Sequence, residues 1–145
     1  MRKSIGYQAI RDKAIKFLKV RLHSAAELRR KLLIRGFSKA LVEQLVKELT
    51  DLGYLNDEIF AESYLDSLIK YKSFGFFGLK AKLLSRGIDE SLISSLLSRK
   101  LSEEQEIILA KKALERKGGT DRIKLMQALS RKGFRSQVIK RLLNV

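Results

Sequence analysis

Lysine and arginine residues gather around a short sequence that occurs three times in the chain. Each copy contains apolar residues, a basic residue, a glycine and a large apolar residue, in segments 31–37, 82–88 and 128–134. The candidate binding residues in and around these copies are Arg29, Arg30, Lys31, Arg35, Lys80, Lys82, Arg86, Arg131, Lys132, Arg135, Lys140 and Arg141. Cations at equivalent positions of a stacked repeat would align into a stripe that could follow a phosphate backbone. The alternative is that they are the solvated faces of amphipathic helices.

Lys72 is a further candidate, because it lies in an aromatic segment. Residues 71–77 hold four aromatic side chains beside Lys72, and single-strand binders combine aromatic and basic residues in this way. Aromatic residues between helices form core more often than they bind nucleotides, so we favour a core between helical units for them.

Catalytic chemistry finds little support in the residue types. The chain has no cysteine, and its one histidine, His23, cannot form a conventional zinc site alone. The acidic pairs at 57–58 and 103–104 fall where helices are expected to begin, and capping explains them there. We therefore expect no enzymatic activity, no metal and no cofactor.

The charge of the chain points to a partner instead. The formal net charge is +15 over 145 residues, concentrated in residues 1–22 and 107–145. Between them, residues 48–69, here called the acidic segment, carry six acidic residues and no lysine or arginine. This segregation of charge favours a polyanionic partner, a partner protein with complementary charged patches, or both. The alternative is chance clustering in a generally basic protein. No apolar run approaches the ~20 residues of a membrane span, so we expect a soluble cytoplasmic protein with no membrane partner.

The elements that position these residues are predicted to be helices. Apolar residues recur at helical spacing from residue 4 to 22 and in eight later segments, and glycines close several of them. Capping residues open the helices, and we assign this role to Ser24, Ser38, Asn56, Asp89, Ser102 and Thr120. We predict an all-α fold of nine helices in three tandem three-helix repeats (1–55, 56–101 and 102–145), stacked as an elongated curved array.

Several segments resemble the RecX family of recombination regulators. The resemblance is carried by residues 24–32, the Gly36–Phe37 turn, residues 52–64, 75–79 and 83–88, and residues 132–134, with 52–64 the most specific. Two positions depart from the family pattern: Phe76 stands where proline is frequent, and Gly78 stands where a basic residue is usual.

The resemblance implies a non-enzymatic modulator of the RecA recombinase. Members of the family bind the RecA filament on single-stranded DNA, lodge in its groove, and typically restrain ATP hydrolysis and strand exchange. Contact with single-stranded DNA would be weaker, or made through the filament. The alternative is a helical-repeat protein that acts directly on DNA or RNA. If the partner is the RecA filament, the acidic segment would oppose a basic patch on that partner or pair with basic residues of its own chain.

Overall fold

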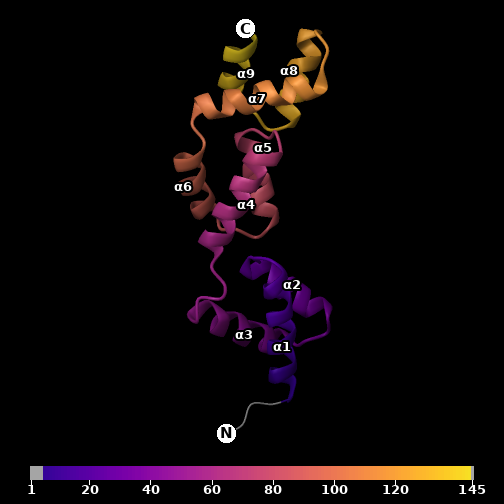
Figure 1. Ribbon diagram of the computed structural model, residues 1–145, viewed down its shortest axis with the longest axis vertical. Helices are drawn as coiled ribbons and strands as arrows, with labels where there is room; N and C mark the ends of the chain where they lie inside the picture. The colour runs from indigo at the N-terminus through magenta and orange to yellow at the C-terminus, as the bar shows by residue number, and fades with distance from the viewer. Residues whose placement is uncertain (1–4, 145) are drawn as a thin grey trace. The chain divides into compact units, whose positions relative to one another are not determined.

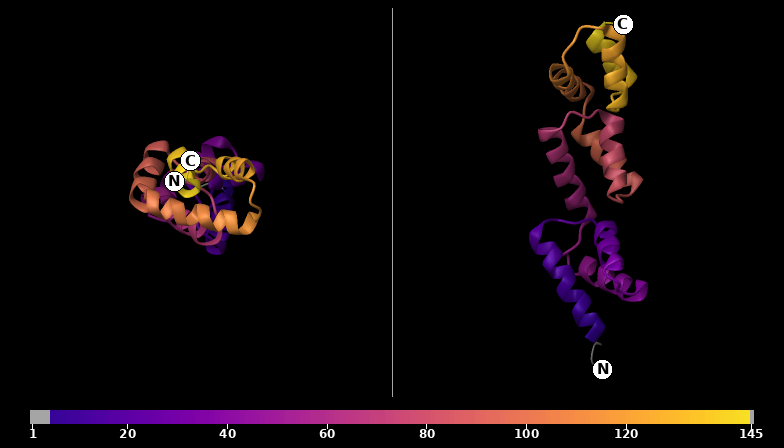
Figure 2. Two further views of the ribbon diagram at one scale, coloured as in Figure 1. Left: turned by 90° about the horizontal axis from the view of Figure 1, so that it is seen from above. Right: turned by 90° about the vertical axis from the view of Figure 1, so that its right-hand side faces the viewer.

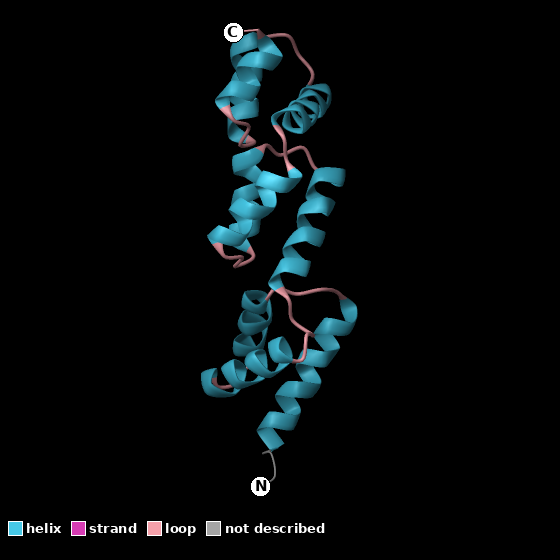
Figure 3. Ribbon diagram, turned by 90° about the vertical axis from the view of Figure 1, so that its left-hand side faces the viewer, coloured by secondary structure: helices cyan, strands magenta, loops and turns pink. Residues whose placement is uncertain are grey.

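The computed structural model describes residues 5–144, and within this range every regular element is an α-helix (Figures 1 and 3). The predicted all-α fold with nine helices is therefore confirmed for the described residues. The helices are α1 (Ile5–Val20), α2 (Ala25–Ile34), α3 (Lys39–Asp51), α4 (Asp57–Tyr71), α5 (Phe76–Ser85), α6 (Glu90–Lys100), α7 (Glu103–Lys117), α8 (Arg122–Arg131) and α9 (Ser136–Leu143).

The chain divides into two compact units. In the described range, the first unit extends to Ala61 and includes Arg86–Ile88, and the second comprises Glu62–Ser85 and the residues from Asp89 onward. The repeat boundaries after residues 55 and 101 stay predictions, and residues 1–4 and 145 of the outer repeats lie outside the described residues.

The first unit buries one apolar face of each of α1, α2 and α3. These three helices contact one another, as the views in Figures 1 and 2 agree. Each contributes residues at three- and four-residue spacing, which places them on one side of a helix. The core consists of Tyr7, Ile10, Ala14, Leu28, Leu32, Val42, Leu45, Val46, Leu49 and Leu55.

The second unit repeats this construction with other helices. Helix α5 packs against α6, and α7, α8 and α9 contact one another. Its fully buried large side chains are Leu65, Leu79, Leu83, Ile93, Leu96, Leu97 and Leu129.

Most of the residues predicted to cap the start of a helix are confirmed in that role. Ser24 and Ser102 each form a complete capping box, and the side chains of Ser38 and Asp89 also accept hydrogen bonds from the first turn of their helices. The Asn56 side chain accepts from the amide of Ile59, 3.2 Å away. These caps satisfy amide groups that a helix start leaves without a partner. Only a few residue types can do so, and the cap residues can therefore be predicted from the sequence.

Three local predictions were wrong. The cap of α8 is Asp121, not Thr120, and its side chain accepts from the amide of Lys124. Helix α1 ends at Val20 rather than at residue 22, and the predicted start at Ser4 lies outside the described residues. In the aromatic segment, Phe77 is 55% exposed, so this side chain does not belong to a core. The backbone of that segment makes the close contacts instead, as described below.

Candidate interaction surface

The turn Arg86–Ile88 lies against the start of α2 in the first unit. The Ser24 hydroxyl donates to the Arg86 carbonyl at 2.6 Å, and the Arg86 guanidinium pairs with the Glu27 carboxylate at 2.7 Å. A Cβ atom on Gly87 would overlap that of Ala26, so only glycine permits this approach. These contacts join two segments that are far apart in the sequence, since Glu27 and Arg86 are 59 positions apart.

The carboxylate of Glu27 is held by more than one donor. Its side chain is 6% exposed and also pairs with Arg21 at 3.1 Å. Burial raises the pKa of Glu27, but hydrogen bonds from Arg21 and Ser24 and the charges of Arg21 and Arg86 outweigh it, so the pKa lies below its ordinary value. Glu27 is therefore ionised at neutral pH and ties Arg86 to the start of α2.

The second unit contains a similar contact between a glycine turn and a helix start, in which residues 132–134 lie against the start of α5. We call each of these two contacts a joint. The Gly75 amide donates to the Lys132 carbonyl at 3.0 Å, and the Phe77 amide donates to the Gly133 carbonyl at 2.8 Å. A Cβ atom on Gly78 would overlap the Lys132 carbonyl oxygen. A glycine at position 78 is therefore what permits this backbone contact.

The Glu106 carboxylate binds residues on both sides of this second joint. Its side chain is fully buried, and one carboxylate oxygen accepts from the amides of Phe76 (3.1 Å) and Arg135 (2.9 Å), while the other accepts from the Arg135 guanidinium at 2.6 Å. Phe76 begins α5, and Arg135 directly precedes α9. One negative charge therefore sits at two helix N-termini, where the helix dipoles favour it.

These joints give two candidate binding residues partners within the chain. Arg86 and Arg135 each bind a buried glutamate, so their cationic groups support the fold. Three other candidates form exposed or half-exposed ion pairs: Arg29 with Glu43, Lys80 with Glu90, and Arg141 with Glu103 and Glu104. Exposed pairs contribute little to stability.

Cations gather around the Phe17 ring in the first unit. The Nζ atoms of Lys31 and Lys13 lie 5.0 and 5.9 Å from the ring centroid, and the Arg35 guanidinium carbon lies 5.3 Å from it. We call these four residues the Phe17 cluster. Cation–π attraction holds the charges in place while leaving their hydrogen-bond donors available.

His23 lies against the Phe17 cluster as a neutral ring. Its Nδ1 is 3.0 Å from the Arg21 carbonyl, to which it donates, and its Nε2 is 2.8 Å from Lys31 Nζ, from which it accepts. Burial, with the charges of Arg21 and Lys31, lowers the pKa of His23 below its ordinary value. Burial and neighbouring cations, chiefly Arg21, likewise lower the pKa of Lys31. His23 thus acts as an acceptor that orients Lys31.

A second set of cations surrounds Phe74 in the second unit. The Nζ atoms of Lys82 and Lys132 lie 5.1 and 5.3 Å from the ring centroid. We call these three residues the Phe74 cluster. Neither lysine forms an ion pair among the described residues.

The remaining candidates are solvent-exposed cations without an ion pair in the part of the chain that the structure describes. They are Arg30, Lys72, Arg131 and Lys140. No geometric feature distinguishes them from other exposed lysines and arginines.

Much of the acidic segment pairs with groups of its own chain. Glu48 bonds Arg11 at 3.0 Å, Asp57 accepts from the Ala25 amide at 2.9 Å, and Lys100 lies 3.3 Å from both Glu62 and Asp66. Of the two alternatives for this segment, pairing within the chain is thus realised at most of its positions.

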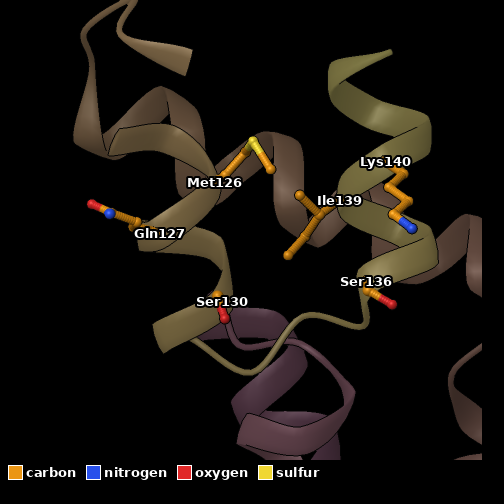
Figure 4. A pocket seen from close by; sticks show the side chains of 6 residues that line it. All are labelled: Met126, Gln127, Ser130, Ser136, Ile139 and Lys140. Atoms are coloured by element: carbon orange, nitrogen blue, oxygen red, sulfur yellow. The ribbon is translucent and has the colours of Figure 1, made fainter. Parts of the chain in front are cut away.

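The structure has a shallow depression of about 270 Å³ between α8 and α9 (Figure 4). Met126 and Ile139 point into it, whereas Gln127 is directed away, and Lys140 is its one titratable lining residue. Within residues 5–144, no group of three or more His, Asp or Glu side chains could hold a metal ion, and no helix is long and apolar enough to cross a membrane.

The sequence analysis did not single out Lys13 or Phe17, and for the aromatic segment, which contains Phe74, it favoured a core over nucleotide binding. It also missed Glu27 and Glu106 as the partners of arginines. The i, i+4 spacing of Lys13 and Phe17 was an available signal, because such residues adjoin on a helix. No local signal marks Glu106, since its partners come from two other helices.

Comparison with known proteins places the chain in a family. A family model described as RecX, first three-helix domain, matches residues 11–49, and one described as RecX, second three-helix domain, matches residues 56–97. The Regulatory protein RecX of Chlorobium phaeobacteroides strain BS1 is 34% identical over 136 residues, covering 92% of this chain and 90% of the relative. That of Lactococcus lactis subsp. cremoris strain MG1363 is 31% identical over 131 residues, covering 83% of this chain but 49% of the relative.

Solved structures agree with the fold. The crystal structure of RecX from Lactobacillus salivarius superposes with a TM-score of 0.82 at 22% identity, covering 96% of this chain and 95% of that one. A second, a crystal structure of regulatory protein RecX, gives a TM-score of 0.85 at 23% identity, covering 97% and 72%. On the two domain matches and the near full-length relatives, the chain belongs to the RecX family of regulatory proteins.

Proposed function

We propose that this protein binds the RecA filament on single-stranded DNA and inhibits its ATP hydrolysis and strand exchange. Family membership supports a regulatory role. The observation that carries the proposal is the pair of cation–aromatic clusters around Phe17 and Phe74. These clusters keep cations available after the chain's own acids have been paired.

The clusters suit an anionic surface better than scattered lysines do. Ring contact restricts the side chains of Lys31, Lys82 and Lys132, so less conformational entropy is lost when a phosphate or carboxylate binds. Binding alone would be sufficient for regulation, because a ligand that prefers one filament state shifts the equilibrium without chemistry of its own. The proposed site of action is the cytoplasm, without enzymatic activity of the chain.

Within this proposal, the interaction residues divide by their contacts. The Phe17 and Phe74 clusters supply the principal cations, and Arg30, Lys72, Arg131 and Lys140 add exposed charge. Arg29, Lys80 and Arg141 exchange an exposed intramolecular pair for the partner. Arg86 and Arg135 act as positioning residues through Glu27 and Glu106.

A second candidate is a protein that acts directly on DNA or RNA. The aromatic ring in each cluster favours it, since stacked rings and cations together form single-strand binding surfaces. The two candidates differ in salt dependence. A surface dominated by phosphate contacts loses about 0.7 of a logarithmic unit of affinity per contact and decade of salt on single strands.

The test measures single-strand-dependent ATP hydrolysis by RecA at two salt concentrations, with the chain at stoichiometric amounts. The proposal expects slower hydrolysis at both, and a weaker effect for the double variant Lys82→Gln, Lys132→Gln. The matched control is Lys111→Gln, Lys112→Gln, which removes the same charge from exposed positions on α7. Unchanged hydrolysis and filament lifetime with the wild-type chain would refute the proposal. Tight RecA-independent binding to single strands with a steep salt slope would favour the second candidate.

A further inference from the structure

The three copies of the repeated glycine turn differ in what covers them. The turns at Gly87 and Gly133 each lie against a helix start, and a Cβ on either glycine would overlap that segment. Gly36 has the same left-handed backbone, with φ of 93°, yet no described atom lies within 4 Å of a Cβ built there. We call residues 34–37 the free turn.

The free turn also differs in its side chains. Ile34 is 75% exposed, whereas the equivalent positions of the covered turns hold the polar residues Ser85 and Arg131. Phe37 is half-buried, whereas its equivalents Ile88 and Phe134 are each 3% exposed. Of the three copies, the one whose glycine has open surroundings is therefore also the one that exposes an apolar residue.

The two covered turns indicate what such a turn binds. In both, donors at a helix start bond the turn carbonyls: the Ser24 hydroxyl bonds Arg86, and the amides of Gly75 and Phe77 bond Lys132 and Gly133. A small residue in the first helical turn, Ala26 or Gly78, admits the glycine.

One of the two covered turns also involves a charge. In the first joint, Glu27 in the first turn of α2 neutralises the arginine that precedes Gly87. Arg35 precedes Gly36 in the same way, and it forms no ion pair among the described residues. No described group donates to the carbonyls of Arg35 and Gly36.

We propose that the free turn docks onto the start of a helix in a partner protein, one with a small residue and a glutamate in its first turn. The carboxylate pairs with Arg35, helix-start donors bond the two open carbonyls, and Ile34 is covered. Nucleic acid fits less well, because phosphate groups carry no donor for the carbonyls.

A second copy of this chain fits poorly as that partner. The helix starts of α2 and α5 are already covered by the chain's own turns. The remaining equivalent, α8, begins with Arg122, Ile123 and Lys124, so it offers a lysine where α2 has Glu27 and an isoleucine where α2 has Ala26. Lys124 would repel Arg35, and such like-charge contacts are a common means of excluding wrong partners.

The test uses the full chain and the natural joint as a probe, so it needs no recombinase and is independent of the function proposed above. The ¹⁵N-labelled chain is titrated with a lactam-bridged helical peptide of the sequence 23–34, which carries the α2 start. We expect saturable amide shifts at Arg35, Gly36 and Phe37, and none at Gly87, whose turn is covered. A peptide with lysine in place of the glutamate, and separately the chain variant Ile34→Ser, should each weaken binding by about tenfold or more, as expected for an unpaired charge or a lost apolar contact.

Each other outcome overturns the proposal. Absence of shifts at residues 35–37 up to the highest peptide concentration would mean that the free turn binds no helix start. Equal binding of the lysine peptide would remove the role of the carboxylate. Shifts at these amides that depend on the concentration of the chain alone would assign the surface to a second copy, and shifts with a single-stranded oligonucleotide but not the peptide would assign it to nucleic acid.

Discussion

Replacing Glu106 by glutamine should destabilise the second unit, although the side chain keeps its size. The amide oxygen can still accept from the two backbone amides of Phe76 and Arg135. The amide nitrogen then replaces the oxygen that lies 2.6 Å from the Arg135 guanidinium, so two donors face each other. The charge that stabilises two helix starts is lost as well.

The expected cost follows from these contacts. A charge-assisted hydrogen bond contributes about 1.5–3 kcal/mol, and charge at a helix start adds about 0.3–1 kcal/mol at each end. We expect Glu106→Gln to lower the free energy of unfolding by about 3 kcal/mol, and to lower the melting temperature by roughly 6–12 °C for a chain of this size. The matched control is Glu104→Gln on the same helix, whose exposed pair with Arg141 should contribute less than about 1 kcal/mol.

Thermal and urea unfolding followed by circular dichroism measure the global effect. Hydrogen exchange at the amides of Phe76 and Arg135 measures it locally, and this reading does not depend on whether the two units unfold together. Exchange at both amides should accelerate in Glu106→Gln and not in Glu104→Gln. If Glu106→Gln melted within 2 °C of Glu104→Gln, with both amides still protected, the carboxylate would not be the anchor of the two helices.

Three further predictions concern the other joint, the histidine and the binding surface. Gly36→Ala should lower stability by about 1 kcal/mol, from backbone strain alone. Gly87→Ala should cost about 3 kcal/mol because it also overlaps Ala26. Equal melting temperatures of these two variants would contradict the joint. Since the folded-state pKa of His23 is lowered, its contribution to stability should be complete above pH about 6.5 and decline as the pH falls; His23→Gln should remove this decline in urea titrations at several pH values, and a slope that persists would exclude His23 as its source. Lys82→Gln should weaken binding to the RecA filament, measured by fluorescence anisotropy, without changing the melting temperature. A lower melting temperature with unchanged binding would instead identify Lys82 as a structural residue.

The candidate site could be predicted from the sequence only in outline. The repeated glycine turn marked where basic residues gather, and the family resemblance followed from residues such as those at 52–64. Which cations remain available could not be predicted, because Arg86 and Arg135 find their glutamates 59 and 29 residues away. The aromatic segment was misjudged for a related reason: the backbone amides of Gly75 and Phe77 bond residues 132 and 133, whereas the Phe77 side chain is exposed.

The sequence by itself determined the helices, most of their caps and the family, because periodicity and capping depend on residues within a few positions of one another. Local patterns fail where two residues compete for the same role, as Thr120 and Asp121 did at the start of α8. The tertiary structure alone decided which glycine turns are covered and which cations are paired. Those properties arise from contacts between segments far apart in the chain. The basic residue at one repeated position is therefore bound to a buried glutamate in Arg86 and solvent-exposed in Arg35.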